Sequence, residues 1–387
     1  MELEGEPIKR KFKKQRVPTD PFEYINEFHL RNLVLQHLRF DEVLSASTVS
    51  PKWKEIIANS DSAMSRMKMN FYDSSSTYPT RTEVTKLLKS SRRYKALEFD
   101  FRLMSNIERK LLLLKRFSLS LVDLTLTYRC RVPINKLPLN ISFPQLRTLQ
   151  LDICLKSNNL ITECFTQVED LETITFNGAG GHTQSTIDLI KRQNKLKKLN
   201  IECWNREILF AHNVFKDAKF KLESLSWNSC EKKPLSITPQ INFNEFLLQH
   251  SNTLTFIFID TITKIDLMVI VNDLKALKTL HFHIILGSRT DLIFKSNHCI
   301  QELKTNEFYG VELLPKGLLK SLKAIEHLIL NHLDEDILNW IAGNLMSLKK
   351  LTYDTASEIQ DINAYYSLLT SRLGHLGWNV NIELEQT

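Results

Sequence analysis

The sequence predicts an α/β solenoid in which a curved parallel sheet lies inside and helices lie outside. A short phrase of large apolar residues, with the spacing L-x-x-L-x-L, returns along the chain. Its middle residue stands at positions 97, 124, 149, 174, 199, 225, 257, 280, 303, 328, 351 and 376. Helical patterns fall between the copies. Strands and helices that alternate with a period in the twenties stack into one parallel sheet covered by helices on one side.

The phrase is clearest in four places. These copies are Leu121-Leu124-Leu126, Leu146-Leu149-Leu151, Leu196-Leu199-Ile201 and Ile325-Leu328-Leu330. Two copies continue through two further residues to a cysteine, at Cys154 and Cys230. In this phrase and period, residues 94–387 resemble the leucine-rich-repeat family. The resemblance implies a solenoid of strand–helix units that bury their apolar faces only by stacking on one another.

The segments between the copies predict helices and connections. Helical periodicity covers residues 107–116, 185–193, 244–250, 265–274, 335–344 and 362–372. Prolines at 133, 138 and 144 predict an extended connection, and residues 231–239, which contain two prolines, predict a long loop. Residues 378–384 alternate between apolar and polar, so we expect an edge strand that closes the end of the sheet.

Charge and composition narrow the class of protein. The chain of 387 residues carries a formal net charge of +7, and the first twenty residues, with six basic and four acidic groups, supply +2 of it. An excess spread this thinly favours solubility over nucleic-acid binding. No apolar run reaches the roughly eighteen residues that a membrane span needs, and the first residues lack the apolar stretch of a secretory signal. The six cysteines form no C-x-x-C pair. We therefore expect a protein of the cytoplasm or nucleus that binds no membrane.

Residues 21–60 predict a small helical module unlike the rest of the chain. Apolar residues recur at helical spacing from Phe22 to Leu38, and Asp41 stands where it can cap a helix over Glu42–Val49. Ser50-Pro51 then opens a third helix with proline at its first position. Three short helices bury too little apolar surface to be stable alone, so we expect the module to hold a partner.

Two further segments flank this module. Residues 1–20 predict a disordered basic tail, because Lys9 to Arg16 is a run of basic residues with almost nothing to bury. The run is typical of a nuclear localisation signal or an anion-binding tail, and equally of a solvated leader. Residues 61–93 predict a linker and an N-terminal cap of the solenoid, with a strand over 67–71 and a helix over 82–89.

Three motifs of the module follow one another in a known order. They are Leu33-Val34-Leu35-Gln36-His37-Leu38, Asp41-Glu42-Val43-Leu44 and Val49-Ser50-Pro51-Lys52-Trp53-Lys54-Glu55-Ile56. In this order they resemble the F-box, whose pattern runs from an apolar helix through Asp-x-Leu-Leu to Val-Ser-x-x-Trp. The family usually begins with Leu-Pro, whereas Ile25-Asn26-Glu27 stands here. A helical cap for the solenoid is the alternative interpretation of the module.

The F-box resemblance implies binding to the adaptor subunit of a cullin–RING ubiquitin ligase. The residues that would form the module core and its adaptor-facing surface are Leu33, Val34, Leu38, Val43, Leu44, Val49 and Trp53. The chain would then be the substrate-recognition subunit of an SCF-type E3 ubiquitin ligase, with no catalytic step and no cofactor of its own. The alternative is a leucine-rich-repeat scaffold with a degenerate F-box and no link to a ligase.

The residues that flank the repeat leucines predict the substrate surface. Side chains alternate along a strand, so these residues point out of the sheet on its concave side. We expect a protein substrate to contact Phe256, Phe258, His281, His283 and Lys304, because exposed phenylalanines beside histidines are unusual where nothing binds. A further column could favour a basic ligand, although Asn and Asp more often form turns. It consists of Asp152, Asn177, Glu202, Asn228, Asp260, Asn331 and Asp354.

No enzyme or metal chemistry is predicted from the motifs. His281 and His283 share one strand face, but no carboxylate or thiol cluster in the sequence completes a metal site. Residues 178–181 are rich in glycine yet match no phosphate-binding motif, and the repeat explains them as a turn. No Ser-His-Asp or Cys-His arrangement is evident in the sequence.

Overall fold

The structure is a computed structural model of the whole chain, and it divides into two compact units. The smaller unit consists of Met1–Lys68 with Ser91–Lys95, and the larger of Met69–Ser90 with Ala96–Thr387. The residues that the structure describes are 34–35, 37–38, 40–71, 81–90, 92–100, 107–128, 141–153, 165, 167–178, 184–202, 206–211, 215–229, 235–286, 293–305, 316–330, 341, 344–345, 347–354 and 381–385.

The described part of the smaller unit contains three short helices, α2 (Phe40–Ala46), α3 (Pro51–Ala58) and α4 (Asp61–Arg66). Ser50 caps α3 as predicted, because its Oγ accepts a hydrogen bond from the Trp53 N–H at 3.2 Å and Pro51 follows it. The prediction for α2 was wrong at both ends. The helix starts at Phe40, so Asp41 lies in its first turn and not before it, and the helix ends at Ala46. The helix predicted over residues 22–38 lies almost entirely outside the described residues.

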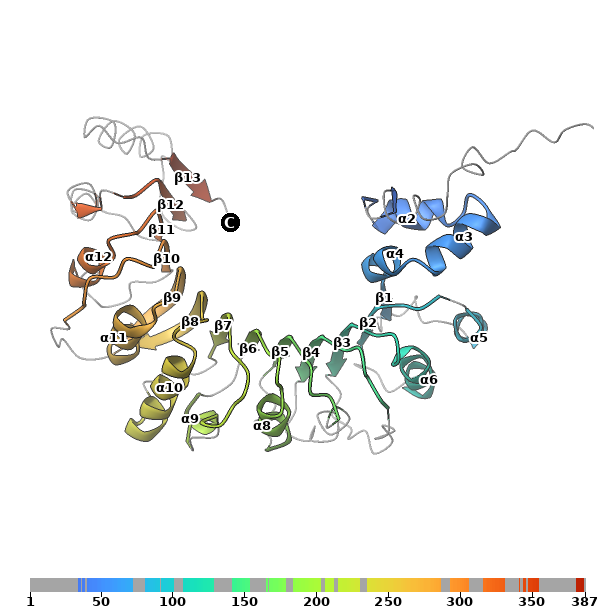
Figure 1. Ribbon diagram of the computed structural model, residues 1–387, viewed down its shortest axis with the longest axis horizontal. Coiled ribbons are helices and arrows are strands. Elements are labelled where there is room, and N and C mark those ends of the chain that lie inside the picture. Colours follow the sequence, from blue (N-terminus) through green and yellow to red (C-terminus); the bar gives the residue numbers. More distant parts are fainter. Residues whose placement is uncertain are drawn as a thin grey trace, which may run out of the picture. The chain divides into compact units, whose positions relative to one another are not determined.

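The larger unit is built on one sheet with the strand order β1 to β13, which is also the order of the sequence. Every pair of neighbours from β2 to β13 is parallel (Figure 1). The strands are β1 (Lys68–Phe71), β2 (Ala96–Asp100), β3 (Asp123–Tyr128), β4 (Thr148–Ile153), β5 (Thr173–Asn177), β6 (Lys198–Glu202), β7 (Ser224–Asn228), β8 (Phe256–Thr263), β9 (Thr279–Leu286), β10 (Glu302–Thr305), β11 (His327–Leu330), β12 (Lys350–Asp354) and β13 (Asn381–Glu385). A long open parallel sheet is consistent with the predicted solenoid.

The register of the sheet follows the repeated phrase. The middle apolar residue of each copy pairs with that of the next copy, from Leu97 opposite Leu124 to Leu328 opposite Leu351. All eleven of these side chains, at 97, 124, 149, 174, 199, 225, 257, 280, 303, 328 and 351, have an exposure of 0%. The expected copy at 376 was wrong as the next layer, because Ile382 in β13 pairs with Leu351.

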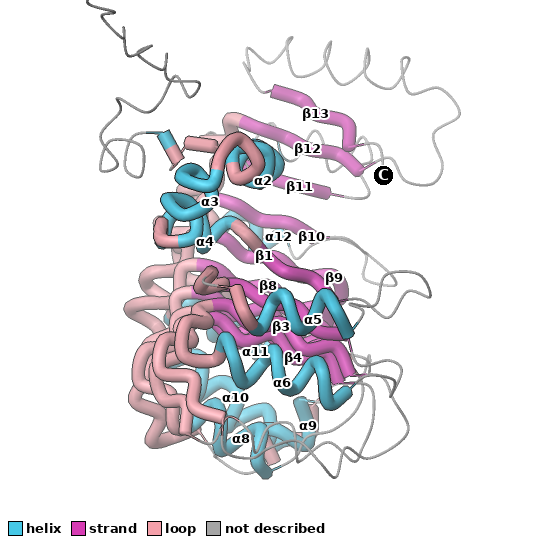
Figure 2. Tube along the Cα trace, turned by 90° about the vertical axis from the view of Figure 1, so that its right-hand side faces the viewer, coloured by secondary structure: helices cyan, strands magenta, loops and turns pink. Residues whose placement is uncertain are grey.

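Helices of the larger unit lie on one side of this sheet (Figure 1), and the described loops gather along one of its edges (Figure 2). They are α5 (Arg81–Leu88), α6 (Ile107–Phe117), α8 (Gln184–Lys191), α9 (Arg206–Leu209), α10 (Ile237–Gln249), α11 (Lys264–Asp273) and α12 (Lys316–Ser321). Helices α6, α8 and α11 confirm three predictions to within two residues at each end. Of the helices predicted at 335–344 and 362–372, only Ile341 and Asn344 are among the described residues.

The prediction of a long loop over 231–239 was wrong at its end. Helix α10 begins at Ile237, seven residues before the predicted start at Asn244, and includes Pro239 in its first turn. Backbone N–H groups in the first turn have no acceptor within the helix, so a proline there removes no hydrogen bond. The proline therefore marks the start of a helix rather than a loop.

Buried polar side chains complete the turns that lead into three strands. In each turn the backbone N–H of the first apolar residue of the phrase donates to a side chain that is itself buried. The pairs are Leu171 with Gln193 Oε1 (2.9 Å), Leu222 with His250 Nδ1 (3.4 Å) and Ile300 with Asn297 Oδ1 (2.9 Å). Buried N–H groups need an acceptor, so these polar residues take part in the core.

Candidate functional site

The face of the sheet opposite the helices, here called the helix-free face, holds the predicted substrate residues. In β8 the residues Ile257 and Ile259 are buried, whereas Phe256 and Phe258 are half-buried. The same alternation recurs in β5, β6, β7 and β10. Side chains that alternate with core residues point to the opposite face, as strand geometry requires. No described element of this unit covers that face (Figure 1).

Phe256, Phe258, His281 and His283 form one block on β8 and β9. The ring centroids of Phe256 and His281 are 5.3 Å apart at an interplanar angle of 76°. Those of Phe258 and His283 are 5.1 Å apart at 71°. Edge-to-face contacts of this kind are favourable and fix the orientation of the rings. The structure thus brings four of the predicted residues together, and the fifth, Lys304, pairs in register with His281 on the next strand.

Glu302 on β10 continues the block toward β12. Its carboxylate contacts His281 Nε2 at 2.7 Å and His327 Nδ1 at 3.4 Å, and His327 Nε2 lies 2.8 Å from the Thr352 hydroxyl. Burial lowers the pKa of His281, the hydrogen bond and charge of Glu302 oppose this effect, and the charges of Lys304 and His327 add to it. Burial alone would raise the pKa of Glu302, but the hydrogen bonds and charges of His281 and His327 outweigh it and lower that pKa. Glu302 flanks Leu303 just as Lys304 does, so strand alternation alone could have identified it.

A buried ion pair lies behind the block, next to the carboxyl end of β8. Arg206 Nη1 is 3.7 Å from Asp266 Oδ2, and Arg206 also donates to the Thr261 carbonyl. Gln240 donates to Asp266, whose backbone N–H in turn donates to the Thr263 hydroxyl at 3.1 Å. Burial lowers the pKa of Arg206 and raises that of Asp266. These contacts fix β8 to α9, α10 and α11 beneath the aromatic block.

Asp260 joins the ion pair to the helix-free face. Its carboxylate accepts a hydrogen bond from His283 Nδ1 at 2.7 Å. Its negative charge raises the pKa of Arg206 and so opposes the larger effect of burial on that pKa. Asp260 is buried within β8, so the expectation that it forms a turn was wrong. The same correction applies to the other described members of that column. Asp152, Asn177, Glu202, Asn228 and Asp354 all lie in strands, and Asn331 lies outside the described residues.

Aspartate and asparagine remain in these strands because their neighbours hold them there. Asp152 pairs with Asn177 and Glu202 pairs with Asn228 in the parallel register. Backbone pairing with an adjacent layer outweighs the local preference of these residues for turns. By strand alternation, Asp152, Asn177, Glu202, Asn228 and Asp260 lie on the helix-free face, where Glu202 is exposed and Asp260 is buried.

In the smaller unit, the predicted adaptor residues divide between core and surface. Val43 is fully buried and Trp53 is only 5% exposed, so both belong to the core. Val49 is 59% exposed, and Val34 and Leu38 are half-buried. Leu33 and the side chain of Leu44 lie outside what the structure describes. Of the predicted set, Val49 is thus the described residue most accessible to a partner.

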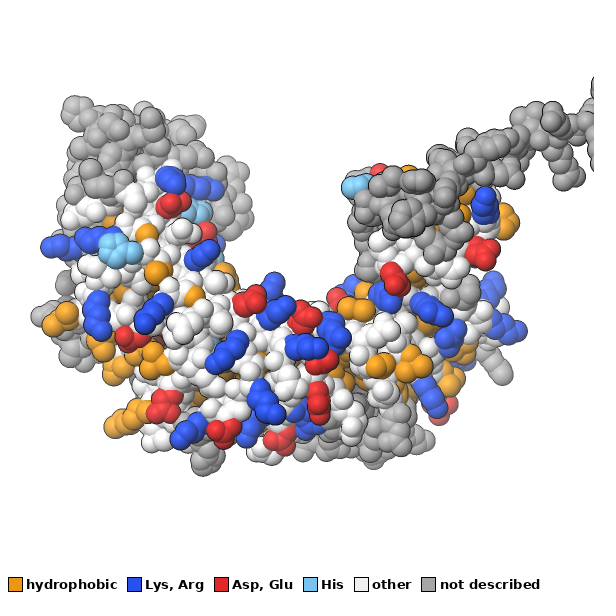
Figure 3. All heavy atoms as spheres, viewed as in Figure 1, with side chains coloured by type: hydrophobic (Ala, Val, Ile, Leu, Met, Phe, Trp, Pro, Cys, Tyr) orange, Lys and Arg blue, Asp and Glu red, His pale blue; other side chains and the backbone are white. Residues whose placement is uncertain are grey.

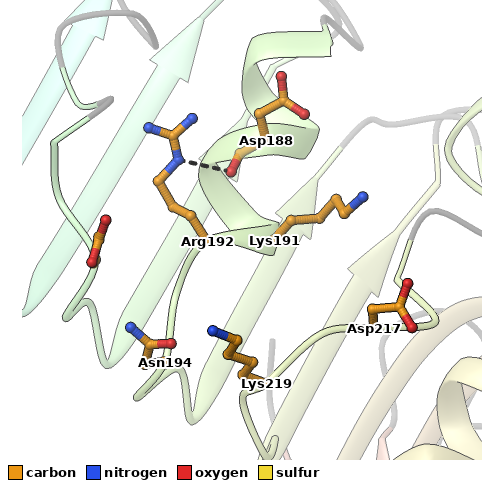
Figure 4. A pocket seen from close by; sticks show the side chains of 7 residues that line it. Asp188, Lys191, Arg192, Asn194, Asp217 and Lys219 are labelled. Atoms are coloured by element: carbon orange, nitrogen blue, oxygen red, sulfur yellow. Dashed lines mark hydrogen bonds between the residues drawn. The ribbon is translucent and has the colours of Figure 1, made fainter.

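The face of the larger unit that Figure 3 shows carries interleaved charges of both signs. A pocket of about 520 Å³ near α8 shows the same mixture (Figure 4). Its lining residues are Glu169, Asp188, Lys191, Arg192, Asn194, Asp217 and Lys219. Arg192 Nε donates to the Asp188 carbonyl at 3.0 Å. Opposite charges of equal number give this pocket no preference for an anion or a cation, so we assign it no ligand.

In the part of the chain that the structure describes, no group of three or more histidine, cysteine, aspartate or glutamate side chains is arranged to hold a metal ion. Among the same residues, no helix is long and apolar enough to cross a membrane.

Comparison with known families identifies the module at the front of the chain. The family model of the F-box domain matches residues 28–63. This match supports the F-box prediction made from the motifs between Leu33 and Ile56. F-box domains bind the adaptor of cullin–RING ligases, and the match therefore indicates a role of the SCF type in general terms. A search of the curated proteins finds no match to the chain.

Proposed function

We propose that this protein is the substrate-recognition subunit of an SCF-type E3 ubiquitin ligase. The match of residues 28–63 to the F-box domain carries this proposal. The long parallel sheet supports it, because a sheet with a core on one side and an uncovered face on the other offers a wide recognition surface. The regular register also supports membership of the leucine-rich-repeat family.

In this proposal, each of the two units binds a different partner. The F-box domain holds the adaptor, and the helix-free face holds a protein substrate through Phe256, Phe258, His281, His283 and Lys304. The chain itself performs no covalent step. It raises the local concentration of substrate lysines near the conjugating enzyme, which is an effect of tethering. Ligases of this type act in the cytoplasm and nucleus, where we expect this protein.

Adaptor capture by the purified full chain tests the first half of the proposal. We expect Val49→Asp to reduce capture at least about tenfold, because it places a charge at an apolar contact. Leu119→Asp is the matched control, since Leu119 is an equally exposed aliphatic residue (63%) in the larger unit. If the unaltered chain captures no adaptor, the scaffold interpretation replaces the ligase proposal.

Trp53→Ala is a weaker test of adaptor contact. The Trp53 side chain is buried together with Ile56 and Ile57 on α3, so its removal leaves a cavity in the module. Such a change costs about 3–5 kcal/mol and can unfold a small domain. Loss of capture by this variant would report on folding, and Val49→Asp separates the two causes.

Proximity labelling in cells tests the second half of the proposal. We expect Phe256→Ser with Phe258→Ser to remove substrates from the labelled set and to leave adaptor capture unchanged. Both side chains are half-buried and point away from the core, so the fold should tolerate the change. Ile237→Ser with Ile241→Ser is the control on the helix side, where both residues are exposed. An unchanged set of labelled proteins in the double-serine variant at 256 and 258 would show that this block does not select substrates.

A further inference from the structure

One row of side chains runs across five strands of the helix-free face at their carboxyl ends. This carboxyl row consists of Asp152, Asn177, Glu202, Asn228 and Asp260, on β4, β5, β6, β7 and β8. Each of these residues follows a buried core position of its own strand. The three carboxylates lie on every second strand, and an amide stands between them. None of the five side chains is cationic, so the row carries a negative charge.

The accessible charge of the row is concentrated on β4 and β6. Glu202 is exposed and Asp152 is half-buried, whereas Asp260 is buried against His283 and lies near Arg206. Among the described residues, the buried Asn177 Oδ1 atom has no hydrogen-bond partner. The row is therefore complementary to a ligand that brings positive charge and hydrogen-bond donors.

The spacing of the carboxylates limits the conformation of such a ligand. Neighbouring strands lie about 4.8 Å apart, so carboxylates on alternate strands recur at about 9.6 Å. A polyproline II segment has three residues per turn and rises about 3.1 Å per residue, so every third side chain points the same way at intervals of about 9.3 Å. The two repeats match. A β-strand does not offer this match, because its side chains alternate with a period of two.

An aromatic surface adjoins one end of the row. Phe258 is half-buried and its ring contacts the His283 ring. His283 in turn forms a hydrogen bond with Asp260 at the end of the row. A ligand that follows the row toward β8 thus meets an apolar contact after its last basic side chain. Apolar contacts of aromatic residues contribute strongly at recognition surfaces.

We infer that the helix-free face binds an extended, basic segment of a partner protein, with a lysine or arginine at every third position and an apolar side chain next to it. Asp152 and Glu202 receive two basic side chains, and Phe258 with His283 receives the apolar one. The inference rests on the proposed function only in assigning this segment to the substrate.

Fluorescence anisotropy with the full chain and three labelled peptides tests the inference. The first peptide repeats lysine, proline and glycine and ends in phenylalanine. The second has the same composition with its lysines adjacent, and the third replaces lysine with glutamate. We expect the first to bind about tenfold more tightly than the third and about threefold more tightly than the second, with an affinity that falls as salt rises. Equal binding of the first and second peptides, or tighter binding of the third, overturns the inference.

Charge reversal places the binding on the row. Asp152→Lys with Glu202→Lys should weaken binding of the first peptide at least about tenfold, and Glu202→Lys alone at least about threefold. Asp217→Lys, in the pocket near α8, is the matched control and should change nothing (Figure 4). Glu202 is exposed, so the single variant is expected to fold even if the double variant does not. Unchanged affinity in the Glu202 variant would refute the assignment to this row.

Adaptor capture on the same preparations separates this inference from the proposed function. A chain that captures the adaptor but shows no preference among the peptides retains the ligase role and loses the inference. A chain that prefers the first peptide but captures no adaptor retains the recognition surface and loses the ligase role.

Discussion

Thr305 offers a direct test of how the core of the sheet is built. It occupies the third apolar position of its repeat, is fully buried, and pairs in register with Phe282 and Leu330 on either side. Its hydroxyl has no hydrogen-bond partner among the described residues. A buried hydroxyl without a partner costs about 1–3 kcal/mol. Valine keeps the branched shape and removes that cost, so we expect Thr305→Val to raise the free energy of unfolding by about 1–2 kcal/mol.

Urea denaturation followed by far-ultraviolet circular dichroism measures this change as a shift in the midpoint. Thr263→Val is the matched control, because the same substitution there removes a hydroxyl that caps α11 and accepts from the Asp266 N–H at 3.1 Å. Losing such a cap costs about 0.5–2 kcal/mol, so the control should lower the midpoint. A lowered or unchanged midpoint for Thr305→Val would mean that its hydroxyl is bonded in the folded protein and would refute the reasoning.

Two further predictions concern buried charges. Burial and the charge of Lys221 lower the pKa of His250 to about 4, so the folded protein resists a proton that the unfolded chain accepts at about 6.5. Stability should therefore be lost as pH falls from about 6.5 to about 4, by about 3 kcal/mol in total, and urea midpoints should show a flatter profile for His250→Gln. Asp266→Asn removes the carboxylate of the buried ion pair with Arg206, and we expect the same assay to show a loss of about 3–5 kcal/mol.

The repeated phrase made the sheet predictable from the sequence. Leucines such as Leu199 and Leu225 must be buried in every layer, and stacking them is the arrangement that leaves none exposed. Their pairing in register follows directly, because a slip by one residue would turn each core side chain outward. The periodicity also predicted which residues of β8 and β9 face away from the helices. Strong patterns of this kind carry information about contacts between layers as well as about local structure.

Contacts between side chains of different layers could not be predicted in the same way. The bond between His283 and Asp260 and the ion pair of Arg206 with Asp266 join residues 23 and 60 positions apart in the sequence. Nothing in the local pattern shows that Arg206 is buried. The row from Asp152 to Asp260 was misjudged for a related reason, since local turn preference was weighed without the pairing of neighbouring layers.

Core residues and residues of the helix-free face alternate along strands such as β5 and β6. Substitutions on that face can therefore change which partner is bound without lowering the stability of the fold. In β8, Ile257 and Ile259 hold the layer while Phe256 and Phe258 point to the other side, so substitutions of the phenylalanines remove no core contact. Asp260 departs from this separation, because it bonds His283 on the face and lies near Arg206 in the core. Reversing its charge would disturb both. Binding experiments at Asp260 would therefore mix recognition with folding, whereas the exposed Glu202 reports on recognition alone.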